Sequence, residues 1–177
     1  MQYSLRKRGR DSEAPLEESL GPLVRALGMS LIEVSLYKGR QKGSVQVRLV
    51  VLSPGAEGST GLEDCSRVHR AVMPRLELAF PGQEIYLEVS SPGIDRLIKD
   101  GSELAHYLGR GIRCYRTDIS DWSAGRLVSV NEEEIVLHNE EGDLVLPLEV
   151  IAKARLYSAP LGGAALRPVQ KNKTYRS

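Results

Sequence analysis

Only a few side chains in this sequence have the type and spacing that catalysis or metal binding requires. Cys65 and His69 lie four residues apart, the helical spacing of two ligands to one metal ion. No second pair accompanies them, and zinc sites need three or four protein ligands, so a packed cysteine beside a surface histidine is the simpler interpretation. Ser90 and Ser91 are candidate nucleophiles, but no Gly-x-Ser-x-Gly motif surrounds them. The sequence therefore predicts neither a metal centre nor a catalytic serine.

Residues for nucleotide chemistry are also missing from the sequence. No Gly-x-x-x-x-Gly-Lys loop, which would hold phosphate groups, occurs anywhere in the chain. Residues 132–134 are three consecutive glutamates, which a solvated turn explains. Trp122 follows polar residues in an expected loop, where it could stack on a nucleic-acid base, although a cap on a barrel is the simpler interpretation. We therefore expect a protein that is not an enzyme and that uses no cofactor and no metal.

Charge is distributed unevenly along the chain, although the net charge is only +1. Residues 1–10 and residues 158–177 each carry four basic and no acidic side chains, whereas the residues between them hold 16 basic and 23 acidic ones. Basic arms on an acidic body favour contact with nucleic acid, and an aid to solubility is the alternative. A Lys-Gly-Arg-Gln-Lys-Gly loop adds basic side chains, with a solvated turn as its alternative. The candidate RNA-contacting residues are Arg6, Lys7, Arg8, Arg10, Lys38, Arg40, Lys42, Lys171 and Lys173.

Composition and cysteine usage indicate the class of protein. With 41% hydrophobic and 27% charged residues, the chain of 177 residues suits one generous domain or two small ones. No apolar run approaches the ~20 residues of a membrane helix, and the N-terminus lacks the apolar stretch of a signal peptide. Cys65 and Cys114 are far apart, as expected of free thiols in a reducing compartment. We expect a cytoplasmic protein.

Hydrophobic periodicity predicts an α-β-β-α-β domain over residues 12–94. Ile32, Val34 and Leu36 alternate on one face of the first strand, and the second strand shows the same alternation. The expected elements are a helix over about 12–28, strands over 31–37 and 44–52, a helix opened by a Thr60–Glu63 capping box, and a strand over 84–90.

The second half of the sequence changes to short strands separated by turns. Segments 111–117, 123–130, 134–139 and 143–148 have this character, and a last strand follows before residue 157. Short, closely spaced strands predict a small β-barrel over residues 95–157. Periodicity is lost from residue 158, which predicts a basic, disordered tail over 158–177.

The stretch Ser-Ser-Pro-Gly-Ile-Asp-Arg, residues 90–96, lies at the boundary between these two halves. Pro92 and Gly93 suit a change of chain direction, with φ > 0 expected at Gly93, and the serine hydroxyls can bond exposed backbone amides. Asp95 and Arg96 can hold the halves together, and we expect Arg96 to pair with a carboxylate or carbonyl across the boundary. An interdomain hinge explains this stretch better than an active site. The residues assigned to the hinge are Ser90, Ser91, Pro92, Gly93, Asp95 and Arg96.

Residues 85–98, Ile-Tyr-Leu-Glu-Val-Ser-Ser-Pro-Gly-Ile-Asp-Arg-Leu-Ile, closely resemble the signature of the RimP family of ribosome maturation factors. Leu97 departs from it, because the family usually has proline there, and this leaves the exit from the hinge less rigid. The resemblance spans roughly residues 15–157. Supporting segments are 27–39, 61–72, 108–116 and 150–156.

The resemblance implies an α+β protein, with an N-terminal α-β-β-α-β domain followed by a small Sm-like or SH3-like β-barrel. It implies a factor that binds the assembling small (30S) ribosomal subunit, its 16S rRNA and its proteins, and promotes maturation without catalysis. We expect a monomer with no membrane partner and no small-molecule substrate. An Sm-like RNA-binding regulatory module is the alternative, and a hydrolase using Ser91 ranks last.

Overall fold

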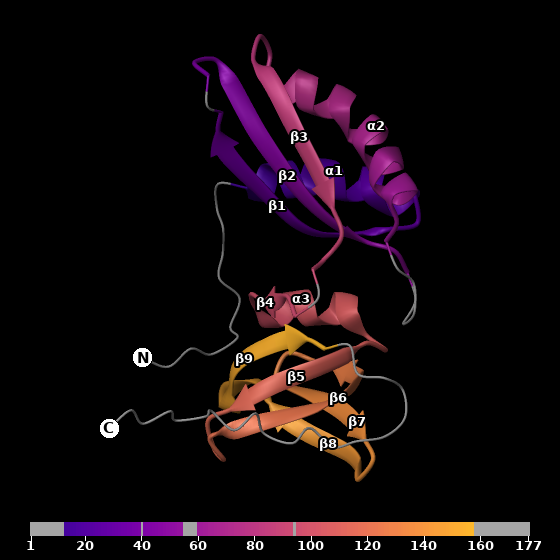
Figure 1. Ribbon diagram of the computed structural model, residues 1–177, viewed down its shortest axis with the longest axis vertical. Helices are drawn as coiled ribbons and strands as arrows, with labels where there is room; N and C mark the ends of the chain where they lie inside the picture. Colours follow the sequence, from indigo (N-terminus) through magenta and orange to yellow (C-terminus); the bar gives the residue numbers. More distant parts are fainter. Residues whose placement is uncertain (1–12, 40, 55–59, 94, 158–177) are drawn as a thin grey trace, which may run out of the picture.

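The computed structural model describes two parts of the chain, each with its own β-sheet and its own buried core (Figure 1). We call residues 13–93 the N-terminal part and residues 95–157 the C-terminal part. Among the described residues, no helix is long and apolar enough to cross a membrane. The structure describes residues 13–39, 41–54, 60–93 and 95–157.

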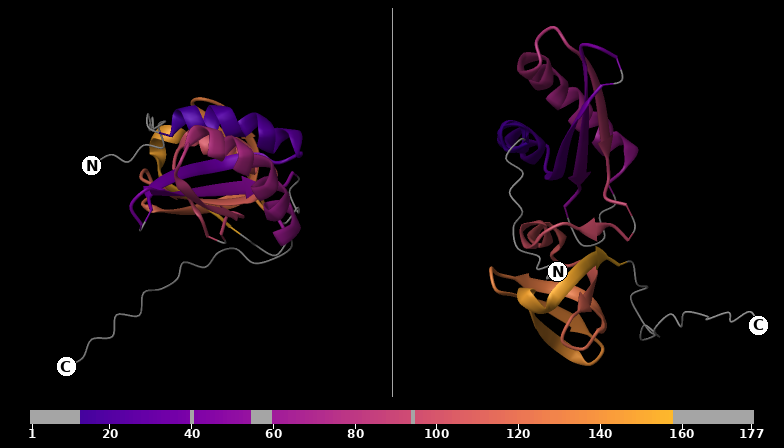
Figure 2. Two further views of the ribbon diagram at one scale, coloured as in Figure 1. Left: turned by 90° about the horizontal axis from the view of Figure 1, so that it is seen from above. Right: turned by 90° about the vertical axis from the view of Figure 1, so that its left-hand side faces the viewer.

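The N-terminal part has the predicted α-β-β-α-β order. Its elements are α1 (Ala14–Ala26), β1 (Ser30–Lys38), β2 (Ser44–Leu52), α2 (Leu62–Ala79) and β3 (Glu84–Ser90). Strand β2 is central, antiparallel to β1 and parallel to β3. Both helices cover the same face of this sheet (Figure 2). The predicted layout of the N-terminal part is therefore confirmed.

The core of the N-terminal part lies between the sheet and the two helices. Leu20 and Val24 of α1 and Val72 and Leu76 of α2 are fully buried there. Because strand side chains alternate between faces, every second residue of β2 reaches the same core. These buried residues are Val45, Val47, Leu49 and Val51.

Helix α2 begins one residue later than the sequence pattern predicted. The N–H of Gly61 donates to Asp64 Oδ2 at 3.2 Å, so Asp64 provides the reciprocal contact of the N-terminus. The expected Thr60–Glu63 capping box is wrong because Thr60 Oγ1 accepts a hydrogen bond from the backbone N–H of Ser53 instead, at 2.8 Å.

A bulge in β1 connects the two cores. The pairing register with β2 shifts between Leu31 and Glu33, so Ile32 is the extra residue. Leu31 packs on the N-terminal core, whereas Ile32 packs on the C-terminal core, together with buried Leu52 of β2. The prediction that Ile32 shares a face with Val34 is therefore wrong, because the bulge turns it toward the other part.

The C-terminal part is an antiparallel sheet with a short helical segment beside its first strand. Its elements are β4 (Leu97–Ile98), α3 (Gly101–Leu104), η1 (Ala105–Tyr107), β5 (Gly111–Arg116), β6 (Asp121–Val130), β7 (Glu134–Asn139), β8 (Gly142–Pro147), η2 (Leu148–Val150) and β9 (Ile151–Leu156). The five strands predicted from residue 111 onward are all present. The helical segment of residues 101–107 was not predicted from the sequence.

The strand order of this sheet is β4-β9-β5-β6-β7-β8 (Figure 1). Strands β4 and β8 stand at its two ends, and within the described residues no backbone pairing joins them. The sheet is therefore open at β4 and β8, and the predicted closed barrel is not confirmed. One face of the sheet covers a core that includes Ile112, Leu127 and Leu146, with Tyr107 of η1 fully buried against it.

Candidate functional site at the junction of the two parts

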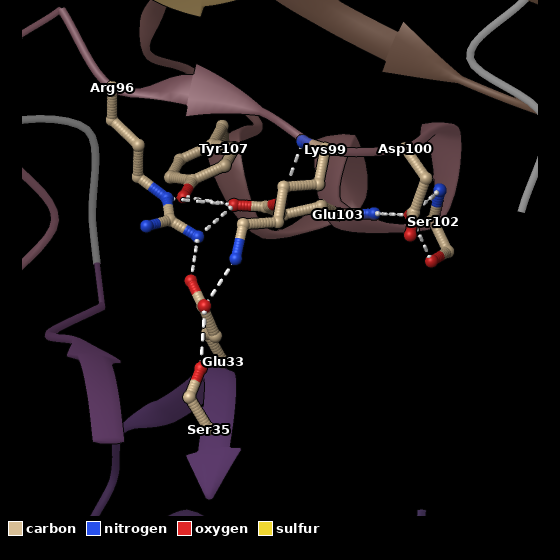
Figure 3. A network of polar contacts seen from close by, with 8 residues as sticks. All are labelled: Glu33, Ser35, Arg96, Lys99, Asp100, Ser102, Glu103 and Tyr107. Atoms are coloured by element: carbon tan, nitrogen blue, oxygen red, sulfur yellow. Dashed lines mark hydrogen bonds and ion pairs between the residues drawn. The ribbon is translucent and has the colours of Figure 1, made fainter. Parts of the chain in front are cut away.

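Arg96 lies between two carboxylates that come from different parts of the molecule (Figure 3). Its Nη2 donates to Oε2 of Glu33 on β1 at 2.8 Å, and its Nε donates to Oε1 of Glu103 on α3 at 2.9 Å. All three side chains are largely buried, with at most 13% of each exposed. The expectation that Arg96 ties the turn to a carboxylate across the boundary is confirmed for Glu33.

Glu33 receives hydrogen bonds from several side chains. Lys99 Nζ contacts its Oε1, and Ser35 Oγ donates to the same oxygen at 2.8 Å (Figure 3). Burial alone would raise the pKa of this carboxyl group, but hydrogen bonds from Lys99, Arg96 and Ser35 outweigh that effect and lower the pKa to about 2. Burial opposes the charge of Arg96 too, yet Glu33 and Glu103 raise its pKa above the usual value. The junction is therefore a buried, ionised cluster.

Helix α3 positions the second carboxylate. Asp100 Oδ1 accepts hydrogen bonds from the backbone N–H groups of Ser102, at 3.0 Å, and Glu103, at 3.1 Å, so it caps the helix. Glu103 then accepts from the backbone N–H of Lys99 at 3.0 Å and from the Tyr107 hydroxyl at 3.0 Å. Burial, followed by the charge of Glu103, raises the pKa of Tyr107, which therefore stays a neutral donor. The helix holds Glu103 in place on the side of the C-terminal part.

Asp95 has a left-handed backbone conformation. Its φ is 60°, in the left-handed region that aspartate and asparagine tolerate better than other non-glycine residues. Its carboxylate pairs with Arg113 Nη2 at 2.6 Å and with Arg155 Nη1 at 3.2 Å, and the same Nη1 donates to its backbone carbonyl at 2.8 Å. Because both arginines belong to the C-terminal part, Asp95 holds the turn to that part and does not bridge the boundary.

Gly93 does not have the positive φ that the sequence analysis expected of it. Its carbonyl accepts a hydrogen bond from the backbone N–H of Arg96 at 3.2 Å, and a Cβ at this position would meet no atom within 4 Å. Asp95 has the left-handed conformation instead, and ion pairs with Arg113 and Arg155 stabilise it there. Ser90 ends β3, and Ser91 is exposed.

The family model of the RimP N-terminal domain matches residues 19–95 of this chain. Residues 19–95 of the chain therefore form a RimP N-terminal domain. This match contains the whole N-terminal sheet, all of α2 and the part of α1 from residue 19 onward, and it ends at Asp95. The resemblance to the RimP family, which was expected over roughly residues 15–157, is therefore confirmed over residues 19–95.

Only two of the basic residues that were candidates for RNA contact lie within the described residues. Lys42 is exposed in the loop between β1 and β2, and Lys38 is the last residue of β1. The other candidates, Arg6, Lys7, Arg8, Arg10, Arg40, Lys171 and Lys173, lie outside the described residues.

The two cysteines are in environments that disfavour the reactive thiolate. Burial raises the pKa of Cys114 to about 12, and burial followed by the charge of Asp64 raises that of Cys65. Within the described part of the chain, no group of three histidine, cysteine or carboxylate residues could hold a metal ion.

Four members of the junction were not predicted from the sequence: Glu33, Lys99, Glu103 and Tyr107. Glu33 had a weak signal, because it is the one charged residue in the predicted strand of residues 31–37. Asp100 and Glu103 have the Asp-x-x-Glu spacing that is typical of a helix N-terminus, and this could have located α3. The paired charges of Glu33, Arg96 and Glu103 join the N-terminal part to the C-terminal part.

Proposed function

We propose that this protein binds the assembling small (30S) ribosomal subunit and promotes its maturation without catalysing a reaction. The observation that carries the proposal is the match of the RimP N-terminal domain over residues 19–95. The junction supports a binding role, because its buried charges satisfy one another across the two parts of the chain.

The hinge gives this role a mechanism. Two linked domains that bind one particle gain affinity only when their linkage lets both reach their sites at once. Arg96 holds residues 12–94 and residues 95–157, our proposed domains, in one orientation through Glu33 and Glu103. The remaining hinge residues, Ser90, Ser91, Pro92, Gly93 and Asp95, shape the turn that makes this contact possible.

The same proposal includes the partners and the compartment. The factor acts as a cytoplasmic monomer on 16S rRNA and ribosomal proteins, and it uses neither a membrane nor a small-molecule substrate. Its basic arms, residues 1–10 and 158–177, contact rRNA phosphates.

Co-sedimentation in sucrose gradients tests the proposal directly. The protein should travel with free small subunits and be absent from joined ribosomes, because an assembly factor must leave before the faces it covers are used. Equal occupancy of the two fractions would contradict an assembly role.

Replacing Arg96 with alanine tests the role of the junction. Arg96→Ala leaves Glu33 and Glu103 buried without their shared partner. Separation of the two parts then becomes favourable, because it returns both carboxylates to water. We expect binding to free small subunits to fall by tenfold or more, a loss of about 1.4 kcal/mol. The secondary structure, followed by circular dichroism, should remain.

Arg75→Ala is the matched control for this experiment. Arg75 is an exposed arginine whose Nε donates to Ser19 Oγ at 2.7 Å within the N-terminal part. Its loss should leave subunit binding unchanged. Equal binding by both variants would show that Arg96 does not orient the parts for the subunit.

A further inference from the structure

The outer face of strands β9, β5 and β6 presents a row of basic and aromatic side chains. Pairing register places Lys153 of β9 opposite Tyr115 of β5, and Tyr115 opposite Trp122 of β6. Residues directly opposite in an antiparallel ladder project from the same face. Cys114 and Ala154, the chain neighbours of this row, are buried on the inner face. Strands β9, β5 and β6 are neighbours in the sheet (Figure 1). The row therefore crosses three adjacent strands on the side away from the core.

The two aromatic rings of this row are held in place but remain accessible. Tyr115 and Trp122 meet edge to face, with ring centroids 5.5 Å apart. The guanidinium carbon of Arg113 lies 4.9 Å from the centroid of Trp122. Trp122 is still 37% exposed. It lies within β6 and points outward, so the interpretation of this residue as a barrel cap in a loop is wrong.

Basic side chains surround these rings. Arg155 of β9 lies opposite Arg113 of β5 in the row next to that of Trp122. Arg126 of β6 lies on the same face, in the row after that of Arg113. Asp95 pairs with Arg113 and Arg155 at one edge. Lys153 and Arg126 are exposed, and neither makes an ion pair with another described residue. The face therefore carries more positive than negative charge around its aromatic centre.

We propose that this face is a binding site for single-stranded RNA. A base stacks on the exposed part of Trp122, and the phosphates on either side meet Lys153 and Arg126. Stacking on aromatic rings in a cationic groove is the general mode by which proteins bind unpaired nucleic acid, because every base has a π-face and every nucleotide a charge. The proposal uses a surface separate from the junction, and it holds whether or not the small subunit is the particle bound.

Trp122 provides a direct test, because it is the single tryptophan of the chain. The full-length protein is titrated with a single-stranded RNA of about 12 nucleotides without self-complementarity, a length within the usual range of such sites. We expect a saturable decrease in tryptophan emission, and a much weaker change with duplex RNA of the same length. If labelled RNA binds by anisotropy while tryptophan emission stays constant, the RNA lies elsewhere and the proposal is overturned.

Substitutions separate this face from the basic arms. Trp122→Ala should weaken single-strand binding, measured by anisotropy of labelled RNA, by about tenfold. Lys153→Gln should reduce the slope of log affinity against log salt by about 0.7, the value of one contact to a single strand. Tyr86→Ala is the matched control, because Tyr86 is 46% exposed on the N-terminal sheet. Equal affinity for Trp122→Ala and Tyr86→Ala, as expected if the face binds a protein instead, would overturn the proposal.

Discussion

Glu33, Arg96 and Glu103 show how a buried charge becomes a structural contact. An ionised group removed from water is costly unless it is paired and hydrogen-bonded. Arg96 satisfies this condition with a carboxylate on each side, and Lys99 brings a second positive charge to Glu33. Glu33 belongs to β1 of the N-terminal part, and Glu103 belongs to α3 of the C-terminal part. Arg96 can therefore contact both carboxylates only when the two parts are docked (Figure 3).

The lowered pKa of Glu33 makes the junction sensitive to acid. Its carboxyl group has a pKa of about 2 in the docked protein, against 4.5 when free of its partners. Because this pKa is lowered, ionised Glu33 stabilises the docked state fully above pH 4.5. This stabilisation is lost as the pH falls toward 2 and the carboxylate is protonated. The shift corresponds to at most about 3 kcal/mol. We expect the radius of gyration, from small-angle X-ray scattering, to rise over this pH range.

Glu33→Gln is the control for this prediction. A neutral amide cannot titrate, so the variant should already be extended at pH 7, with no further transition of the junction between pH 4.5 and 2. If the two proteins show the same dependence of radius on pH, other carboxylates govern the acid response.

At the scale of elements, short connecting segments position the long ones. The bulge in β1 turns Ile32 toward the C-terminal core, and the Asp100 cap begins the helix that presents Glu103. Between them, the turn at Asp95 directs the chain from β3 into β4. These irregular features, more than the strands themselves, decide how the two sheets meet.

The turn predicts opposite outcomes for two neighbouring substitutions. Asp95→Val places a β-branched residue at φ 60° and removes the carboxylate from Arg113 and Arg155, so we expect a loss of about 1–2 kcal/mol in unfolding free energy. Gly93→Val should be nearly neutral, because the added side chain meets no atom within 4 Å. Urea denaturation of both variants measures the difference.

Asp95→Asn separates backbone strain from lost charge at this position. Asparagine tolerates the left-handed conformation, so this variant should keep most of the stability lost in Asp95→Val. A large loss of unfolding free energy in Gly93→Val, with a small loss in Asp95→Val, would show that the turn depends on the conformation of the glycine.

At the scale of the whole molecule, a −7 body carries two basic arms, and a cationic outer face on the C-terminal sheet adds a third positive region. A polyanionic partner would favour these basic regions over the acidic remainder of the surface. The junction then sets where the cationic face lies relative to the N-terminal sheet.

Deleting residues 1–10 and 158–177 tests the contribution of the arms. Every phosphate contact that is lost removes about 0.7–0.9 from the slope of log affinity against log salt. We therefore expect weaker binding to small subunits and a clearly smaller slope, measured by filter binding at several salt concentrations. An unchanged slope would leave solubility as the role of the arms.

The sequence by itself determined the three N-terminal strands, the strands β5 to β9, the two N-terminal helices and the resemblance to the RimP family. Each of these follows from local patterns: alternation places Val47 and Leu49 in the core, and the hinge motif is contiguous in the chain. A partner for Arg96 across the boundary, either a carboxylate or a carbonyl, was also predicted, because the guanidinium group carries only hydrogen-bond donors.

Only the tertiary structure decided which partner that is and which residue takes the strained backbone. Glu33 is 63 residues from Arg96, and periodicity carries no information about contacts between separate sheets. The pairing of Lys153, Tyr115 and Trp122 likewise depends on the register of three strands, which packing of their inner faces selects. The open edges of the sheet and the left-handed φ of Asp95 arise in the same way, because both result from how distant segments fit together.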